Sequence, residues 1–370
     1  MIAAPRREHD SAKLLTVSVD GRIQSLERSD IASLFTPGDL VVANDAATIP
    51  GSLHGTHEPT KSPIEIRLAA FVDADDLTRF IAVAFGAGDH RTTTEDRSPP
   101  PTLRAGDRLV LGPLVAVVER LEQHPRLVEI QLLGGPTEVL AGLAHHGKPI
   151  QYAHVPNRLA LWDVWTTVAA TPFAFEPPSA GFALDWGLLA TWHERGIRFA
   201  TLTHAAGISS TGDSVLDERL PLDEPYVIPA KTAQAIASTK ARGGSVIAIG
   251  TTVVRALESA ASPDGTVSVG SGIATGRIGP RTPIRVVDTI LSGVHEPGES
   301  HFELLRAFTS DGTLHHMHNA ATKGHYRTHE FGDFTLIEYQ GRPLSNRQTH
   351  PPSQLPASIG RSEVTTASAH

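Results

Sequence analysis

The sequence predicts an α/β protein: a mixed, partly barrel-like α/β body that carries an inserted small antiparallel β-barrel. Two patterns along the chain support this fold class. Short alternating strands with few long amphipathic helices run from about residue 58 to residue 147, whereas strands and helices alternate beyond Pro149. The 370-residue length allows two domains, and a composition of 40% apolar and 19% charged residues is typical of globular proteins.

These patterns predict a discontinuous domain organisation. We expect residues 1–57 and 148–340 to form one α/β domain, into which residues 58–147 are inserted as a β-barrel domain. The remaining residues, 341–370, are rich in Pro, Ser, Thr and Gln, and this polar composition predicts a disordered tail.

The elements of the first two segments follow from apolar runs separated by turn sequences. Residues 14–19 and 40–43 are predicted strands, and the turn sequences Asp20-Gly21 and Pro37-Gly38-Asp39 interrupt the chain around them. The insertion shows the same alternation in five further runs, which favours a small antiparallel barrel or sandwich. Its predicted strands are 64–71, 79–85, 107–111, 115–120 and 127–133.

The body is predicted from the alternation of helical and strand periodicity after residue 149. Such alternation is typical of α/β domains in which helices cover a largely parallel sheet. The predicted helices are 185–195, 230–242, 253–260 and 299–308, and the predicted strands are 197–203, 245–249, 284–291 and 334–339.

Composition excludes several classes of function. The chain has no cysteine, which excludes disulfides, thiolate nucleophiles and cysteine-based metal sites. A formal net charge of -8 argues against a generally basic nucleic-acid surface, although a local basic patch would still permit RNA binding. No apolar run approaches 18 residues and the start lacks a signal-peptide core, so we expect a cytoplasmic protein that does not bind membranes. We also expect a monomer or weak homo-oligomer.

The stretch 245–258 is the most informative part of the chain. A β-branched run ends at Gly250, two hydroxyl residues, Thr251 and Thr252, follow, and a helical pattern then places Arg255 and Glu258 one turn apart. One hydroxyl would cap the helix, and the N–H groups beside it would suit a carboxylate. The same junction also serves as a plain connection in many α/β proteins, and Arg255 and Glu258 would then form an ordinary surface pair.

Two histidines follow other predicted strands. His204 comes directly after the strand 197–203, and His295 follows the strand 284–291. Because ligands of α/β folds bind beyond the carboxyl ends of strands, we expect these imidazoles and Thr251 to converge on one site. The alternative is that each is an ordinary loop residue, since the chain has 19 histidines.

Several motifs in sequence order resemble the S-adenosylmethionine:tRNA ribosyltransferase-isomerases of queuosine biosynthesis. The resemblance covers about residues 14–339 and is most specific at Gly-Thr-Thr-x-x-Arg-x-x-Glu. The matching pieces are Pro37-Gly38-Asp39-Leu40-Val41-Val42-Ala43-Asn44, Ile49-Pro50, Pro178-Ser179-Ala180-Gly181-Phe182, Leu202-Thr203-His204, Gly250 to Glu258, Val286-Val287-Asp288, His295 with Pro297, Glu299-Ser300 and Phe331-Gly332-Asp333.

The resemblance implies a chemistry and a set of site residues. Such an enzyme uses S-adenosylmethionine as co-substrate, with no metal, and transfers and isomerises its ribosyl part onto an aminomethyl-7-deazaguanine base of tRNA, giving epoxyqueuosine. The sulfonium acidifies the C5′ hydrogens, so a base must remove one and an acid must help adenine depart. We assign these proton transfers to His204 and His295, and the methionine carboxylate to Arg255. The predicted substrate-binding residues are Asn44, Ser179, Gly181, Thr251, Thr252, Arg255 and Glu258, the last either orienting Arg255 or binding a ribose hydroxyl or an ammonium group.

The chain departs from the family pattern at several predicted site positions. Ala47 replaces an arginine, and Ala183 replaces a histidine. Residues 205–210 differ from the usual Val-Gly-Ala-Gly-Thr-Phe, and residues 292–297 differ from the usual Thr-Asn-Phe-His-Leu-Pro. Two alternatives therefore remain: a diverged paralogue that uses S-adenosylmethionine or a nucleoside with another acceptor, and a non-catalytic RNA- or nucleoside-binding protein.

A histidine-rich segment offers a metal site as a further alternative. His315, His316 and His318 are close in sequence, but no carboxylate or cysteine lies at ligand spacing within the segment. We interpret it as a solvated loop and predict no metal.

Overall fold

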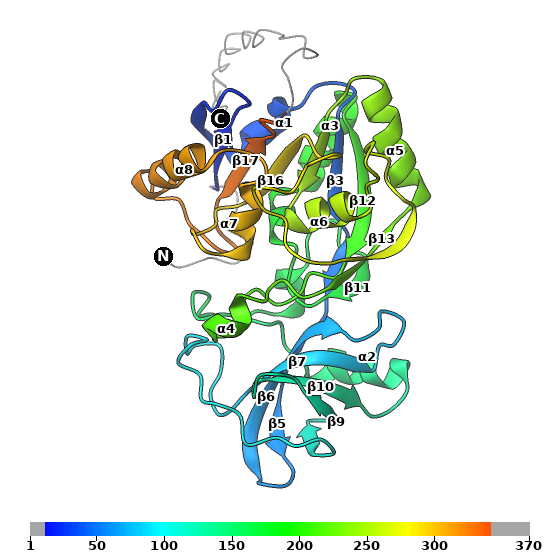
Figure 1. The fold of residues 1–370 in the computed structure, drawn as a ribbon, viewed down its shortest axis with the longest axis vertical. Coiled ribbons are helices and arrows are strands. Elements are labelled where there is room, and N and C mark those ends of the chain that lie inside the picture. The colour runs from blue at the N-terminus through cyan, green and yellow to red at the C-terminus, as the bar shows by residue number, and fades with distance from the viewer. Residues whose placement is uncertain (1–11, 342–370) are drawn as a thin grey trace, which may run out of the picture.

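The protein has two lobes, which Figure 1 shows stacked along the long axis of the computed structural model. The structure describes residues 12–341. The larger lobe is an α/β body on a nine-stranded mixed sheet, and the smaller lobe contains a closed six-stranded antiparallel barrel. The predicted fold class is therefore confirmed, whereas the predicted disordered tail lies, apart from Gly341, outside the described residues.

The sheet of the body has the strand order β15-β13-β12-β3-β14-β16-β17-β1-β2, so its edges are β15 and β2. The four strands β12, β3, β14 and β16 at its centre run parallel to one another. Their carboxyl ends therefore meet at one edge. The strands are β1 (Lys13–Val17), β2 (Ile23–Glu27), β3 (Leu40–Asn44), β12 (Arg198–His204), β13 (Glu224–Ile228), β14 (Val246–Ile249), β15 (Gly270–Ala274), β16 (Thr289–Gly293) and β17 (Phe334–Glu338).

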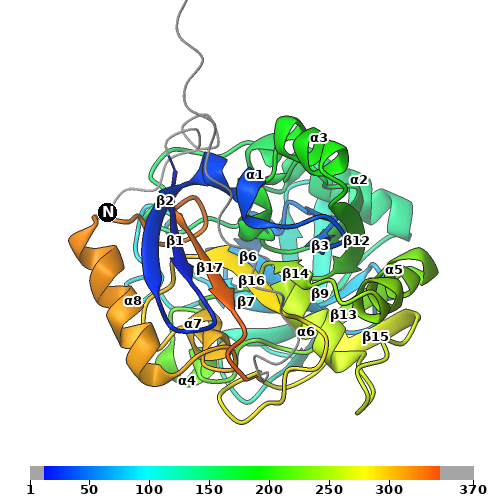
Figure 2. The ribbon, with the colours of Figure 1, turned by 90° about the horizontal axis from the view of Figure 1, so that it is seen from above.

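The central strands are apolar on both faces because both faces are covered. On β3, Leu40 and Val42 belong to one apolar cluster, whereas Val41 and Ala43 belong to another. This two-sided burial explains the uninterrupted apolar runs of the sequence. Figure 2 shows the longer helices around the outside of the sheet. The α-helices are α1 (Ile31–Leu34), α2 (Pro136–His146), α3 (Trp186–Glu194), α4 (Ser214–Asp217), α5 (Ala230–Ala241), α6 (Thr251–Ser259), α7 (Ser300–Leu305) and α8 (Asp311–Lys323), and the short 3-10 helices are η2 (Arg28–Asp30), η3 (Leu161–Val164) and η4 (Ser179–Ala183).

Most strand and helix predictions in the body are correct to within a few residues, but one strand begins late. The prediction for 284–291 placed its start at Ile284, whereas β16 begins at Thr289. The backbone N–H groups of the three residues after Ile284 donate instead to the carboxylate of Glu258. Because these donors are already bound, this stretch does not extend the sheet.

The barrel is closed by strands in the order β10-β7-β6-β5-β8-β9. Its first strand, β5, spans Ser52–His57, so the barrel begins before the predicted domain boundary at residue 58. The other strands are β6 (Ser62–Phe71), β7 (Arg79–Phe85), β8 (Arg108–Leu111), β9 (Leu114–Leu121) and β10 (Leu127–Leu132), and a separate two-stranded sheet pairs β4 (Ala46–Thr48) with β11 (Thr171–Ala174).

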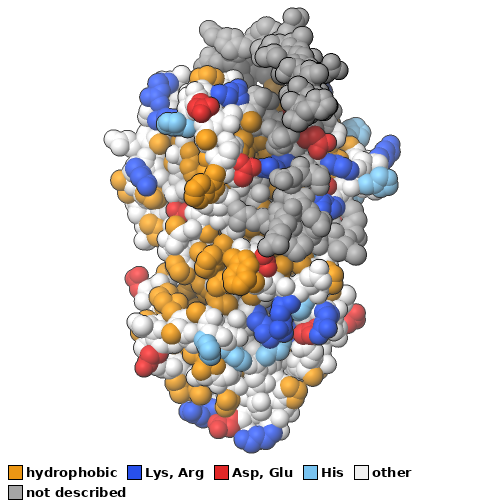
Figure 3. Space-filling model, turned by 180° about the vertical axis from the view of Figure 1, so that it is seen from behind, with side chains coloured by type: hydrophobic (Ala, Val, Ile, Leu, Met, Phe, Trp, Pro, Cys, Tyr) orange, Lys and Arg blue, Asp and Glu red, His pale blue; other side chains and the backbone are white. Residues whose placement is uncertain are grey.

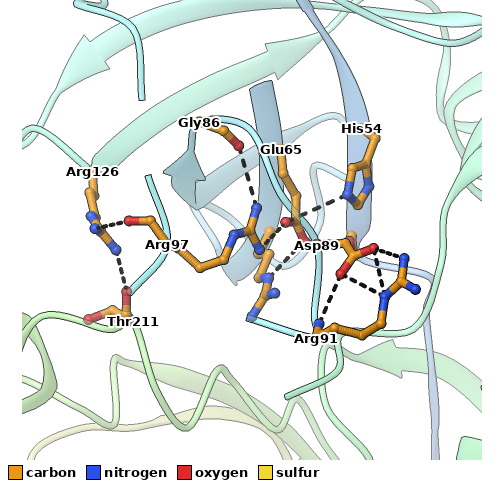
Figure 4. A network of polar contacts seen from close by, with 10 residues as sticks. His54, Glu65, Gly86, Asp89, Arg91, Arg97, Arg126 and Thr211 are labelled. Carbon is orange, nitrogen blue, oxygen red and sulfur yellow. Dashed lines mark hydrogen bonds and ion pairs between the residues drawn. The ribbon is translucent and has the colours of Figure 1, made fainter. Parts of the chain in front are cut away.

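A buried ionic cluster belongs to the barrel lobe and is shown in Figure 4. The carboxylate of Glu65, only 1% exposed, contacts Arg67 Nε at 2.8 Å and Arg97 Nη1 at 2.6 Å. Burial alone would raise the pKa of Glu65, but the two arginines lower it to about 2. Arg126 links this cluster to the body, since it donates to the carbonyl of Arg97 at 3.0 Å and to that of Thr211 at 3.4 Å.

The back of the molecule combines apolar and charged surface. Figure 3 shows apolar side chains gathered where the body meets the barrel, with Lys, Arg, Asp and Glu side chains scattered around them. The visible described residues thus form no extended surface of a single charge on this face. Within residues 12–341, no helix combines the length and apolarity required to cross a membrane.

Candidate active site

A cavity of about 570 Å³ lies beyond the carboxyl ends of the central parallel strands. The chain that follows β12 contributes 206–210 to its wall, the chain that follows β14 contributes 250–252, and Ser292 at the end of β16 is also on the wall. The barrel lobe adds 93–95. This volume is within the range of small-molecule sites, and the position is the one expected of an α/β fold.

The junction after β14 forms one wall of the cavity. Gly250 has a φ of 95°, a left-handed conformation that suits glycine, and it lets the strand turn directly into α6. Thr251 is the first residue of the helix, and Gly250 is its N-cap without a side-chain bond, so the predicted capping by a threonine hydroxyl is wrong. Both Thr251 and Thr252 line the cavity, and the buried Thr252 Oγ1 has no hydrogen-bond partner among the described residues.

His295 faces the cavity, as predicted for a catalytic group. Its Nε2 lies 2.9 Å from Ser292 Oγ, and its Nδ1 lies 3.6 Å from Glu299 Oε2. The imidazole of His301 stacks against it with ring centroids 4.8 Å apart. Burial would raise the pKa of Glu299, but its contacts with His295 lower it, so an anionic carboxylate accompanies the imidazole.

His204 does not reach the cavity. Its side chain is completely buried behind the wall, and neither ring nitrogen has a hydrogen-bond partner in the described chain. Its Nε2 is 3.4 Å from Glu224 Oε2 without hydrogen-bond geometry, and burial lowers the pKa of His204 to about 4. A direct proton transfer from this neutral, enclosed imidazole to a ligand is therefore not compatible with the structure.

Asn44 supports the backbone rather than the cavity. Its side-chain amide donates to the carbonyl of His204 at 2.9 Å, and its Oδ1 accepts the N–H groups of His204 and Ala46. The predicted substrate contact of Asn44 is thus replaced by a structural one, since the side chain is buried and absent from the cavity wall.

Arg255 lines the cavity, but its guanidinium is bound to the protein. Nε donates to Glu224 Oε2 at 2.7 Å, Nη1 to the carbonyl of Gly276 at 2.6 Å and Nη2 to that of Ala274 at 3.0 Å. Glu224 also accepts the N–H of Gly207 at 2.8 Å through its other oxygen. The predicted bidentate contact of Arg255 with a ligand carboxylate is corrected accordingly: this arginine fixes the cavity wall.

Glu258 neither orients Arg255 nor faces the cavity. Its two carboxylate oxygens accept the N–H groups of Arg285, Val286 and Val287 at 2.7–2.9 Å. The predicted roles of Glu258 in orienting Arg255 or binding a substrate are therefore wrong.

The loop before α3 contains two predicted substrate-binding residues with different positions. Ser179, at the start of η4, lies on the cavity wall. Gly181 is buried and is not on the wall, and a Cβ there would lie 2.8 Å from Thr166 Cγ2. Glycine is therefore required at position 181 for close packing, which corrects its predicted role.

Sequence reasoning missed the carboxyl group of Glu176 on the cavity wall. Its Oε1 accepts the hydroxyl of Tyr152 and, at 3.1 Å, the N–H of Ser209. Burial, with a further contribution from Glu330, raises the pKa of Glu176 to about 7. No local signal distinguishes this residue, because its partners come from distant parts of the chain.

Three more histidines of the wall were also missed. His154 Nε2 bonds Glu330 Oε2 at 2.6 Å; burial lowers the pKa of His154, but this carboxylate outweighs it and the net direction is upward. The ring of His329 stacks on His154 with centroids 4.2 Å apart. Burial and the neighbouring His295 lower the pKa of His301 to about 4.

Comparison with known proteins identifies the family. Residues 1–337 match the family model described as "Queuosine biosynthesis protein". The chain belongs to this family. It is 34% identical to the S-adenosylmethionine:tRNA ribosyltransferase-isomerase of Sorangium cellulosum over 90% of this chain and 94% of the relative, and 32% identical to that of Pelobacter propionicus over 90% and 95%. A crystal structure of the S-adenosylmethionine tRNA ribosyltransferase of Thermotoga maritima aligns with a TM-score of 0.47 and 21% identity, covering 90% of this chain and 95% of that one.

The departures from the family pattern lie at different depths. Ala47 is buried in the small β4–β11 sheet and Ala183 is buried at the end of η4, and neither lines the cavity. The altered segment 206–210 does line it. We expected these changes to cluster in the site, and the structure places the segments 206–210 and 292–297, but not Ala47 or Ala183, at the cavity.

The described residues contain no group of three or more His, Cys, Asp or Glu side chains that could hold a metal ion. The histidine-rich segment is helix α8, not the predicted loop, because Leu314, Met317 and Ala321 provide a buried face at helical spacing. His315 and His316 lie on the exposed side of that helix.

Proposed function

We propose that this chain transfers and isomerises the ribosyl moiety of S-adenosylmethionine onto the aminomethyl-7-deazaguanine base of tRNA, giving epoxyqueuosine and releasing adenine and methionine. The observation that carries the proposal is the nearly full-length match to relatives that bear the name of this enzyme. The cavity beyond the strand ends, with a volume suited to a nucleoside, supports it. We retain the predictions of a cytoplasmic location, which suits a tRNA substrate, and of a monomer or weak homo-oligomer.

His295 acts as the base that removes a C5′ proton made acidic by the sulfonium. Ser292 holds one ring nitrogen, and the Glu299 carboxylate beside the other favours the imidazolium that forms. An anionic neighbour that stabilises the protonated ring is the usual support for a histidine base.

The first turn of α6 takes the methionine carboxylate in place of Arg255. The N–H groups of Thr251 and Thr252 lie at a helix N-terminus that opens on the cavity, and the Thr252 hydroxyl still lacks a partner among the described residues. A helix N-terminus favours an anion through its free N–H groups and its dipole. Ser179 contributes a further hydroxyl for the nucleoside or the target base.

Adenine release tests the proposed function. The purified protein is incubated with S-adenosylmethionine and tRNA that carries the aminomethyl-7-deazaguanine base, with unmodified tRNA as control. We expect release only with the precursor-bearing tRNA. Absence of release would contradict the proposal, and release with another acceptor would support a diverged paralogue instead.

The role of His295 is tested by single-turnover kinetics of His295→Gln. Loss of a general base lowers the rate about 10²- to 10⁴-fold. His193→Gln is the matched control, since His193 is exposed on α3 and absent from the cavity wall, and it should retain the wild-type rate. An unchanged rate in the His295 variant would remove the residue from the mechanism.

A further inference from the structure

Because His204 lies outside the cavity, the proton transfer to the departing adenine has no assigned group. The reaction requires an acid for the departing adenine as well as a base for C5′. His295 supplies the base, whereas His204 is sealed behind the wall. The acid must therefore be another titratable side chain that reaches the cavity.

Glu176 is a buried carboxyl group on that wall. It follows the short strand β11 and is 6% exposed. Its Oε1 accepts hydrogen bonds from the Tyr152 hydroxyl and the Ser209 N–H, and the Ser209 side chain also lies close to the carboxyl group. Oε2 takes part in neither of the Oε1 hydrogen bonds, and it is the oxygen from which a proton can pass to a ligand in the cavity.

The charges around Glu176 distinguish it from two other buried carboxylates of the molecule. Glu224 is bonded to Arg255, and Glu65 deeper in the barrel is bonded to two arginines. The groups that face Glu176 are Tyr152, Glu330, His154 and, beyond the tyrosine ring at 5.6 Å, Arg67.

Among residues 12–341, no cationic group donates a hydrogen bond to Glu176. The carboxyl group therefore retains a proton up to a pKa of about 7, raised by burial and by Glu330. A carboxylic acid that is protonated near neutral pH is suited to act as a general acid.

We propose that Glu176 is the proton donor to the departing adenine and that Tyr152 is the residue that positions it. The inference rests on the proposed function and adds a residue to it. The glycosidic C–N bond breaks with its electron pair going to adenine, and the proton on Oε2 moves to a ring nitrogen of that base. Glu176 is left as a carboxylate, which Tyr152 and Ser209 stabilise, and it regains a proton from water after the products leave.

The first test is single-turnover adenine release by Glu176→Gln across a pH series, with S-adenosylmethionine and precursor-bearing tRNA. Gln retains the shape and the acceptor for Ser209 but cannot donate an acidic proton, so we expect a loss of about 10²- to 10⁴-fold. The wild-type rate should fall as pH rises through about 7, and the variant should lose that limb. Glu119→Gln makes the same change on the exposed side of β9 and should leave the rate and its pH profile unchanged.

The second variant, Tyr152→Phe, separates positioning from packing. The hydroxyl bond favours the ionised carboxyl group, so its removal raises the pKa of Glu176 and moves the falling limb to higher pH. A purely structural role for the tyrosine would lower the rate without moving the limb.

The outcomes separate this inference from the function on which it rests. Wild-type protein that releases no adenine overturns both. Wild-type release together with an undiminished rate in a folded Glu176→Gln variant overturns the inference alone. If that variant fails to fold, as judged by its melting temperature, an unshifted limb in Tyr152→Phe overturns the inference.

Discussion

Glu65 in the barrel and Glu176 in the body are both almost completely buried, yet their pKa values move in opposite directions. Arg67 and Arg97 hold the pKa of Glu65 at about 2, whereas Glu176 has a tyrosine hydroxyl and a backbone N–H, and its pKa rises to about 7. Burial alone raises the pKa of either carboxyl group, so the neighbours decide which form is stable. The barrel holds a fixed charge, and the cavity wall holds a titratable proton.

The largest expected effect in this comparison is on folding stability in the barrel. Glu65→Gln leaves Arg67 and Arg97 buried without their carboxylate, and uncompensated buried charges cost about 3–5 kcal/mol. The free energy of unfolding, measured in urea at neutral pH, should fall by that amount. A fall as small as that of an exposed substitution would show that the arginines find other acceptors.

The second effect is a pH dependence of opposite sign at the two sites. The pKa of Glu176 is raised from 4.5 to about 7, so its contribution to stability is complete below pH 4.5 and is lost as pH rises through about 7. The Glu176→Gln side chain does not titrate, so the variant does not lose this contribution. Its free energy of unfolding, relative to that of wild type, should therefore increase by about 3 kcal/mol as the pH is raised from 4.5 to above 7.

For Glu65 the direction reverses, because its pKa is lowered to about 2. Its contribution is present above pH 4.5 and is lost as pH falls through about 2. Urea unfolding of both Gln variants across this pH range measures the two slopes. Slopes of the same sign would refute the contrast between the two environments.

A smaller effect is expected where backbone N–H groups, not cations, bind the carboxylate. Glu258→Gln turns an N–H donor toward the N–H groups of 285–287, and unsatisfied buried donors cost about 1–3 kcal/mol. Urea unfolding should show this loss while adenine release in the folded variant is unchanged. A loss of adenine release without a loss of stability would show that Glu258 contributes to the active site.

The smallest effect is expected for an exposed ion pair near the buried cluster, drawn in the same view in Figure 4. Asp89 and Arg91 form three side-chain hydrogen bonds, but the Arg91 side chain is 71% exposed and that of Asp89 is 36% exposed. Such pairs contribute little because water screens them and the side chains lose entropy. Arg91→Ala should leave the urea midpoint unchanged, and a clear shift would show that the pair supports its loop.

The sequence was sufficient to predict the architecture because periodicity is a local property. The runs of β3 and β14 and the helical spacing of α3 and α5 are visible without tertiary information. The start of β16 was not predictable in this way, because the backbone N–H groups of the residues just before it donate to a distant carboxylate, that of Glu258.

Strand ends predicted part of the site. Thr251, Thr252 and His295 follow strand ends and line the cavity, whereas Asn44 and His204 are the last residues of strands and do not line it. Ser179, which the family resemblance implied, also lines the cavity. The burial of His204 could have been found from strand alternation, because it shares a face with the buried Leu202.

Glu176 offered no such signal. A single glutamate between Phe175 and Pro177 has no diagnostic pattern in the sequence. Its chemistry depends on Tyr152, Ser209 and Glu330, which the fold brings together from separate segments.

The register of the last strand has a consequence for synthesis of the chain. β17 lies between β16 and β1, and it pairs Phe334 with Leu14 across 320 residues. Until the ribosome has released that strand, the β1–β2 hairpin has no neighbour in the sheet and its unpaired edge is a hazard for misassembly. The barrel can close much earlier, since its strands are contiguous from Ser52 to Leu132. A nascent chain should therefore acquire protease resistance first in the insertion and last around its own beginning.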